Sequence, residues 1–267
     1  MKRLWYVSVL VWAVAASANA QTQISGLTEF ARIVEIHAPV PGVVAEVAVG
    51  EGETIVAGDL LVQLEDSLQV SRLAIAEAAV AAQGGVERAR AQLAHAQSRL
   101  TRVTRAVKRG GGSRWEIDEA KFAVNTAQAD VKSAEEQILA NKARLDLETA
   151  ALAQMRITAP FSGTVVEVFA DNGHLASSSD PLLVMVGSGQ MEIVGFVPAT
   201  LMADLSVGDR VSADLAAPVS TRVDAIVKAI DPRIEPGSGS VRIVFEFSNA
   251  GINSPSGVEA TVQIGGS

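Results

Sequence analysis

The chain has 267 residues, of which 48% are apolar and only 4% aromatic, so it has room for one large packed domain or two to three small ones. It contains no cysteine, which excludes disulfides, thiolate metal sites and cysteine nucleophiles. The formal charge of −8, from 22 basic and 30 acidic residues, argues against a general nucleic-acid binder.

Residues 1–20 have the pattern of a secretory signal peptide. Lys2 and Arg3 precede an apolar stretch that begins at Leu4, and Ala18-Asn19-Ala20 places small residues where a signal peptidase cleaves. The apolar stretch is shorter than the ~20 residues that a membrane-spanning helix needs, although an uncleaved anchor stays an alternative. We therefore expect an exported, soluble protein.

Residues 38–64 and 159–186 form an internal repeat. In the ten residues that begin at Ala38 and at Ala159, six coincide at an offset of 121. One inserted residue then aligns Leu60-Leu61-Val62 with Leu182-Leu183-Val184. Short β-branched runs broken by Pro and Gly predict short strands. Since one half cannot bury its apolar face alone, we expect two four-strand halves packed face to face; two unrelated β segments are the alternative.

Each half of the repeat resembles the biotinyl/lipoyl carrier fold. That fold implies a prosthetic group on a lysine at the junction between the halves. No lysine lies between Lys2 and Lys108, or between Lys142 and Lys228. Because a covalent carrier needs this amine, we expect a lipoyl-like fold without a carrier function and without a cofactor.

Residues 67–155 have the heptad pattern of two long helices that form a coiled coil. Gly110-Gly111-Gly112 ends the first helix, and Ser113 with Glu116 predicts a capping box at the start of the second. The result is an antiparallel hairpin with arms of about 40 residues, or ~60 Å. Gly84-Gly85 interrupts the first arm, and Asn141 and Glu148 interrupt the seam of the second. The predicted seam residues are Ile75, Ala79, Ala82, Val86, Ala89, Leu93, Ala96, Leu100, Val103 and Val107 on the first arm, and Ile117, Val124, Val131, Ile138, Leu145 and Leu152 on the second, extended by Ala120, Ala127 and Ala134.

The charges of the two arms are complementary. Residues 67–109 carry eight basic and two acidic residues, whereas residues 114–155 carry eight acidic and five basic ones. Basic residues gather where the arms meet: Arg99, Arg102, Arg105, Lys108, Arg109 and Arg114. This basic tip is either a solvated helix face or a docking site for an acidic partner.

Residues 191–267 alternate apolar and polar positions in short runs separated by turn signals such as Pro236-Gly237-Ser238-Gly239. This spacing predicts a small β barrel or sandwich, to which the segment from about Ile24 to Ile36 adds a strand.

This order of elements resembles the periplasmic adaptor, or membrane fusion, proteins of tripartite efflux and secretion systems, with HlyD-like and RND-type members. Ile230-Asp231-Pro232, Asn249 and Pro255-Ser256-Gly257-Val258 also resemble the barrel of that family. The resemblance implies an elongated α+β fold with a β barrel, a split lipoyl-like sandwich and an inserted coiled-coil hairpin. The implied domains are a signal peptide (1–20), the barrel (21–36 and 188–267), the lipoyl-like domain (37–66 and 156–187) and the hairpin (67–155).

The resemblance also implies a function and partners. The expected protein is a periplasmic adaptor, associated with the inner membrane through an RND or ABC transporter and docked to an outer-membrane channel of the TolC type. It self-associates as a hexamer. The further membrane-proximal domain that many members have is expected to be absent or minimal here, because the chain ends at Ser267.

Four residues at the tip are the predicted channel contacts. The family often carries Arg, then Leu four residues on, then Ser seven further, and this chain has Arg102, Ala106 and Ser113 at that spacing. Ala106 departs from the family pattern, which has Leu at this position. Trp115, beside the turn, is a candidate interface anchor.

We expect no enzyme, because the chain lacks a P-loop, a Gly-x-Ser-x-Gly elbow and a dinucleotide fingerprint. His37, His95 and His174 lack metal-ligand spacing, so no metal site is expected. The alternatives are an adaptor of an ABC-type or type 1 secretion exporter, or a periplasmic coiled-coil scaffold that joins no transporter.

Overall fold

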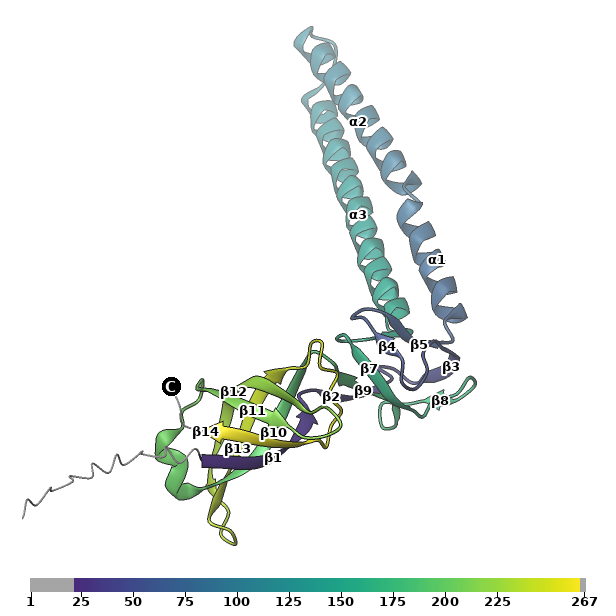
Figure 1. Cartoon of the computed structure of the whole chain (residues 1–267). Coiled ribbons are helices and arrows are strands. Elements are labelled where there is room, and N and C mark those ends of the chain that lie inside the picture. Colours follow the sequence, from purple (N-terminus) through teal and green to yellow (C-terminus); the bar gives the residue numbers. More distant parts are fainter. Residues whose placement is uncertain (1–21, 265–267) are drawn as a thin grey trace, which may run out of the picture. The chain divides into compact units, whose positions relative to one another are not determined.

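The computed structural model describes residues 22–264 and contains a closed β barrel, two four-stranded sheets and a helical hairpin (Figure 1). The expected α+β fold class, with barrel, sandwich and inserted hairpin, is confirmed. The predicted signal peptide lies outside the described residues. Within residues 22–264, no helix is both long enough and apolar enough to cross a membrane.

The barrel has six strands in the order β1-β10-β13-β12-β11-β14. Its first strand closes it, because β1 pairs with β10 on one side and with β14 on the other. Alternate residues of every strand face a core that includes Ile193, Ile243 and Phe245. The strands are β1 (Thr22–Phe30), β10 (Gln190–Pro198), β11 (Arg210–Leu215), β12 (Thr221–Ile234), β13 (Ser240–Ser248) and β14 (Glu259–Ile264), with a 3₁₀ helix η1 (Ala199–Asp204) after β10.

A buried threonine fastens one barrel loop to β1. The Thr28 hydroxyl donates to the Pro255 carbonyl (3.0 Å) and accepts from the Val258 amide (2.9 Å). The Thr28 carbonyl accepts from the Gly257 amide (2.7 Å). Asn249 is buried as well, and its side-chain oxygen accepts from the Ser254 amide (2.8 Å). The polar residues of this loop thus satisfy one another where the loop covers the core.

A lysine on the barrel surface bridges two of three carboxylates that lie on neighbouring strands. Glu29, Glu192 and Glu246 stand directly opposite one another on β1, β10 and β13. The Lys228 ammonium donates to Glu192 (2.8 Å) and to Glu246 (3.1 Å). These two bonds, that to Glu192 first, raise the pKa of Lys228.

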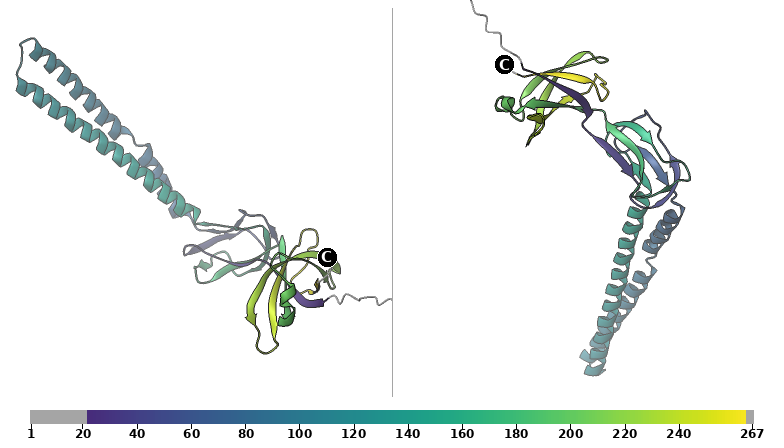
Figure 2. Two further views of the ribbon diagram at one scale, coloured as in Figure 1. Left: turned by 90° about the vertical axis from the view of Figure 1, so that its left-hand side faces the viewer. Right: turned by 90° about the horizontal axis from the view of Figure 1, so that it is seen from below.

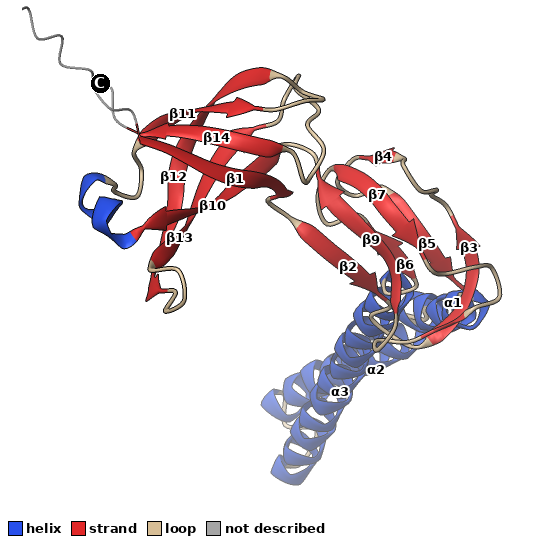
Figure 3. Cartoon of the chain, turned by 60° about the horizontal axis from the view of Figure 1, so that its bottom comes forward, coloured by secondary structure: helices blue, strands red, loops and turns tan. Residues whose placement is uncertain are grey.

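The two remaining sheets run in the orders β2-β9-β7-β4 and β6-β5-β3-β8 (Figure 3). The repeat supplies β3–β5 from its first copy and β7–β9 from its second. Each sheet therefore contains the short strand of the other copy, an exchange that the expectation of two four-strand halves packed face to face did not include. The strands are β2 (Ile33–His37), β3 (Gly42–Val47), β4 (Thr54–Ile55), β5 (Leu60–Leu64), β6 (Arg156–Thr158), β7 (Gly163–Val168), β8 (Leu175–Ala176) and β9 (Pro181–Gly187).

Hydrogen bonds between the two copies are reciprocal at an offset of 121 residues. A bond from one copy to the other recurs with donor and acceptor copies exchanged, which is the signature of a local two-fold relation. The matched backbone bonds are Gly52 N to Val165 O (2.8 Å) with Gly173 N to Val44 O (2.8 Å), and Val44 N to His174 O (2.8 Å) with Val165 N to Glu53 O (3.0 Å). Side chains follow the same rule, since Val47 N donates to Asn172 Oδ1 (3.1 Å) and Val168 N to Glu51 Oε1 (3.2 Å).

The offset of 121 holds through the last strand of each copy. Leu61, Val62 and Leu64 are fully buried in β5, and Leu182, Leu183 and Met185 are fully buried at the corresponding positions of β9. The inserted residue expected from the sequence is therefore not needed. The Leu-Leu-Val match placed the sequence alignment one residue out of register. The burial of the side chains gives the correct register.

The hairpin consists of three helices: α1 (Ser67–Ala81), α2 (Gly84–Lys108) and α3 (Arg114–Ala153). Its base is held by the antiparallel pairing of β5, which precedes α1, with β6, which follows α3. Along the hairpin, Val86, Ala89 and Ala96 of α2 are buried, as are Ala120 and Ala127 of α3. The predicted antiparallel seam between these two helices is confirmed.

The first arm is broken where Gly84-Gly85 was expected to interrupt it, and the seam changes phase there. In α1 the buried residue is Ala76, whereas Ile75, the predicted seam residue, is 65% exposed. Ala82, also predicted for the seam, is exposed at the end of α1. The prediction was wrong by one position because it carried the heptad through a break that resets the helix. A Cβ at Gly84 or Gly85 would meet nothing within 4 Å, so close approach within the chain is not their role.

Asn141 on α3 lies opposite this break. Its side-chain amide donates to the Ala79 carbonyl (3.0 Å), and its side-chain oxygen accepts from Gln137 (3.1 Å). A helix that ends leaves its last carbonyls without intrahelical partners. Asn141, which interrupts the apolar seam of the second arm, therefore supplies a hydrogen-bond donor to a carbonyl beside the break in the first arm.

We predict that Gly163→Ala destabilises the protein and that Gly42→Ala, its repeat equivalent, does not. A Cβ at Gly163 would overlap the backbone carbonyl of Val186, whereas at Gly42 the nearest atom would be Leu64 Cδ1 at 3.4 Å. Overpacking of this kind costs about 1–3 kcal/mol. Thermal unfolding of both variants measures the difference, and equal melting temperatures would contradict the close approach.

We predict that Lys228→Met lowers the melting temperature at neutral pH, because it leaves Glu192 and Glu246 adjacent without a cation. The partly exposed pair bonds limit the loss to about 1 kcal/mol. Because the folded-state pKa of Lys228 is raised, its stabilisation is present below the ordinary lysine pKa of ~10.4 and is lost as pH rises through the folded-state value. The gap between wild type and variant should close above that pH; a constant gap would refute the assignment.

Candidate functional site

The hairpin turn is built by two helix caps in succession. At the end of α2, the Gly111 amide donates to the Ala106 carbonyl (2.9 Å) and the Gly110 amide to the Val107 carbonyl (3.0 Å). This is a Schellman motif, and Gly110 has the positive φ of +81° that it requires. At the start of α3, Ser113 and Glu116 form the predicted capping box, with the Ser113 amide 2.9 Å from Glu116 Oε2. The turn is therefore fixed at both ends.

All four residues predicted to contact the channel are exposed at this tip. Arg102 and Ala106 lie one helical turn apart on α2, and Trp115 is 70% exposed in the first turn of α3. Ser113 is the N-cap of α3, and its hydroxyl accepts from the Glu116 amide (3.4 Å). The cap explains Ser113 without any partner, so a channel contact of this hydroxyl stays a prediction.

The tip carries cations that are free to meet a partner. Arg99 pairs with Glu119 across the two arms (3.6 Å). Within residues 22–264, no ion pair involves Arg102, Arg105, Lys108, Arg109 or Arg114. Exposed, unpaired cations at the end of a hairpin give a positive field that attracts acidic surfaces.

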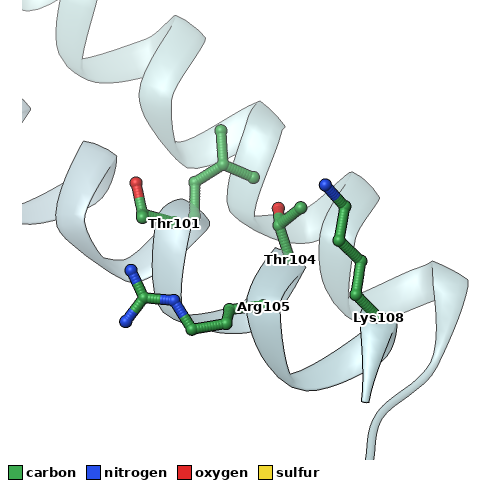
Figure 4. Close-up of a pocket in the computed structure, with 5 residues that line it drawn as sticks. Thr101, Thr104, Arg105 and Lys108 are labelled. Atoms are coloured by element: carbon green, nitrogen blue, oxygen red, sulfur yellow. The ribbon is translucent and has the colours of Figure 1, made fainter. Parts of the chain in front are cut away.

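A shallow hollow of about 360 Å³ lies on α2 just below the turn (Figure 4). It is lined by Leu100, Thr101, Thr104, Arg105 and Lys108. Thr101 already donates its hydroxyl to the Gln97 carbonyl (2.9 Å). The two threonines were missed by the sequence analysis, although their spacing with Arg105 and Lys108 places all four on neighbouring positions of one helix surface.

The chemistry available at the tip is electrostatic and apolar contact. It offers guanidinium and ammonium donors, a hollow that can receive a side chain and an exposed indole. Within the described part of the chain, no group of three or more His, Asp or Glu side chains could hold a metal ion. The site suits noncovalent docking of an acidic protein surface.

A barrel, a strand-exchanged sandwich and a hairpin inserted between its repeats define an adaptor of the membrane fusion protein class. The family model described as "RND MFP, barrel-sandwich hybrid domain" matches residues 32–188. The chain belongs to this RND membrane fusion protein family, which is a family of structural adaptors.

Curated relatives are similar over most of this chain. The multidrug resistance protein MdtA of Salmonella heidelberg (strain SL476) is 28% identical over 248 residues, which cover 88% of this chain and 57% of that protein. MdtA of Klebsiella pneumoniae subsp. pneumoniae is 26% identical over 232 residues, covering 84% and 53%. The chain thus spans little more than half the length of these relatives.

Solved structures share the fold. MacA from Actinobacillus actinomycetemcomitans matches with a TM-score of 0.74 at 19% identity, covering 92% of this chain and 78% of that one. The membrane fusion protein Spr0693 from Streptococcus pneumoniae R6 matches with a TM-score of 0.55 at 17% identity, covering 92% and 99%.

We predict that Ser113→Ala loosens the hairpin tip by about 1 kcal/mol, because it removes the N-cap acceptor of α3. Ser113→Asp should keep the cap, since aspartate is an equally good N-cap residue. Amide hydrogen exchange in the first turn of α3 measures both. Fast exchange in both variants would show that the hydroxyl does more than cap the helix.

Proposed function

We propose that the chain is the periplasmic adaptor of a tripartite efflux pump, linking an inner-membrane transporter to an outer-membrane channel of the TolC type. Its work is binding and geometry rather than bond-making. The observation that carries the proposal is the basic, doubly capped tip of a hairpin whose base is fixed between β5 and β6.

The inner-membrane partner we propose is an RND-type transporter. The RND family model over residues 32–188 and the similarity to MdtA support this choice over an ABC exporter. In the proposed division of labour, the barrel (21–36 and 188–267) contacts the transporter and the lipoyl-like domain (37–66 and 156–187) holds the hairpin (67–155). The chain acts after export by a cleaved signal peptide, as a self-associated ring.

The outer-membrane contact is assigned to Arg102, Ala106, Ser113 and Trp115. Trp115 offers a large apolar surface beside unpaired cations, a combination common at interface hot spots. Ala106 contributes little area, and its small side chain leaves Arg102, one turn away, accessible. The exposed cations steer an acidic channel tip toward the indole.

Photo-crosslinking from the tip tests this assignment. We expect the full-length chain with benzoylphenylalanine at Trp115, produced in its host, to form an adduct with an outer-membrane channel. The same crosslinker at Leu139, which is 64% exposed on α3 but far from the turn, should give none. Mass spectrometry identifies the adducts, and a Trp115 adduct with other proteins alone would overturn the assignment.

A charge-reversal variant provides the second part of this test. Arg102→Glu should reduce the Trp115 adduct roughly tenfold, because it replaces attraction by repulsion at the rim of the contact. Arg72→Glu, an exposed arginine on α1, is the matched control and should leave the adduct unchanged. An Arg102→Glu variant that folds and crosslinks normally would remove Arg102 from the docking site.

A further inference from the structure

The break between α1 and α2 is made by one residue. Ala82 has φ −75° and ψ 77°, and the Gln83 amide donates to the Ala81 carbonyl (2.9 Å), so Ala82 is the centre of an inverse γ-turn. Gln83 itself keeps nearly helical angles, φ −88° and ψ −1°. Rotation of ψ at Ala82 to the helical value of about −42° would therefore join α1 and α2 into one helix. The second arm, α3, runs without a break beside both (Figure 2).

The carbonyl of Ala79 has a hydrogen-bond donor whether the first arm is broken or continuous. In the structure it accepts from the Asn141 side-chain amide (3.0 Å). In one continuous helix it would accept from the backbone amide four residues further on, which is that of Gln83. Because a buried carbonyl without a donor is costly, a partner in both arrangements makes both of them accessible.

The helix α1 carries two apolar faces, of which the broken arm uses one. Ala76 is buried, whereas Leu68 is 57% exposed and Ile75 is 65% exposed. Leu68, Ile75 and Ala82 are spaced by seven residues, and their shared face lies about 100° around the axis from Ala76. In steps of four and three residues, this face continues to the buried Val86 of α2. One continuous helix would turn α1 by about 100° and bury Ile75 in place of Ala76.

The seam is incompletely filled at the break. A hollow of about 290 Å³ lies there, and its lining includes Gln83 and Val86 of the first arm and Ile138 and Leu139 of α3. Leu139 is 64% exposed. Together with Leu68 and Ile75, these side chains are apolar surface that the broken arm leaves in water, which favours the continuous arrangement.

Gly84 and Gly85 oppose that tendency. Neither has φ in the left-handed region, and a Cβ at either position would meet nothing within 4 Å. The broken arm therefore does not require glycine at these positions. It places the two glycines in the first turn of α2, where amides lack intrahelical acceptors, whereas one continuous helix would place them in its interior. Glycine is unfavourable in a helix interior, so the pair favours the break.

We propose that this break is a conformational switch in the first arm. In one state Ala82 interrupts the arm, Asn141 binds the Ala79 carbonyl and Ala76 is buried. In the other state α1 and α2 form one helix, and α1 is turned so that Ile75 is buried. The seam between α2 and α3 is the same in both. The switch goes beyond the adaptor role, because it is a property of the hairpin alone and places a movable joint between its base and its tip.

Thiol labelling tests the switch, and the chain's lack of native cysteine makes the signal specific to one position. Ala76→Cys is introduced into the otherwise unchanged full-length chain and into the Gly84→Ala/Gly85→Ala variant. The rate of reaction with a maleimide is measured under native conditions. We expect the rate to rise roughly tenfold in the double-alanine variant, because alanine favours the continuous helix, in which position 76 faces solvent.

Asn141→Leu provides a second route to the same state. Leucine cannot donate to the Ala79 carbonyl, so the broken arm loses a hydrogen bond that the continuous helix does not need. Labelling of Ala76→Cys should therefore rise in this variant as well. An unchanged rate in both variants would overturn the proposal and make the break a fixed kink.

Two control positions separate a turn of α1 from other changes. Ala74 is exposed and stays exposed when α1 turns by about 100°, so Ala74→Cys should react equally in all variants. Ala89 of α2 is buried in both states, so Ala89→Cys should stay slow. A rise at Ala89→Cys equal to that at Ala76→Cys would mean unfolding of the arm and would also overturn the proposal. The Trp115 adduct with the channel reports the adaptor role separately.

Discussion

The exchange of short strands between the two repeats is the constraint on which the hairpin depends. β4 joins the sheet of the second copy and β8 that of the first, and the reciprocal bonds of Gly52 with Val165 and of Gly173 with Val44 lock the pair. Because neither sheet is complete without the other copy, the two cannot separate without losing backbone hydrogen bonds in both. One of these sheets pairs β5 with β6, and thereby fixes the two ends of the hairpin.

The hairpin tip combines rigidity with accessibility. The Schellman motif at Gly110 and the capping box at Ser113 satisfy the backbone of the turn internally, so the exposed cations and Trp115 are presented on a fixed support. A docking surface that is already ordered loses less conformational entropy on binding. The residues that shape the turn and the residues available to a partner are thus largely different, with Ser113 at the boundary between them.

The sequence predicted local features well and the pairing between distant segments poorly. The heptads of α2 and α3, the capping box and the repeat were all readable, because helix periodicity and caps depend on neighbours within one or two turns. Strand exchange could not be predicted, since two-residue strands such as β4 and β8 carry no sequence pattern that indicates which strand they pair with. At the tip, the basic residues and Trp115 were found, but the hollow at Thr101 and Thr104 was not. The phase of α1 was missed because Ala76 and Ile75 both suit a seam, and only the break near Gly84 decides between them.

The wide sequence separation of the repeats also restricts the route by which the polypeptide folds. Partners such as Val44 and His174 are joined by a long chain segment, and closing such a segment while it is disordered costs entropy. The helices form from near neighbours and pair across a short turn, so they can assemble early and draw β5 and β6 together. Early formation of the inserted hairpin would then bring the two repeats together before their strands pair. This would reduce the slow mispairing of strands between the two sheets.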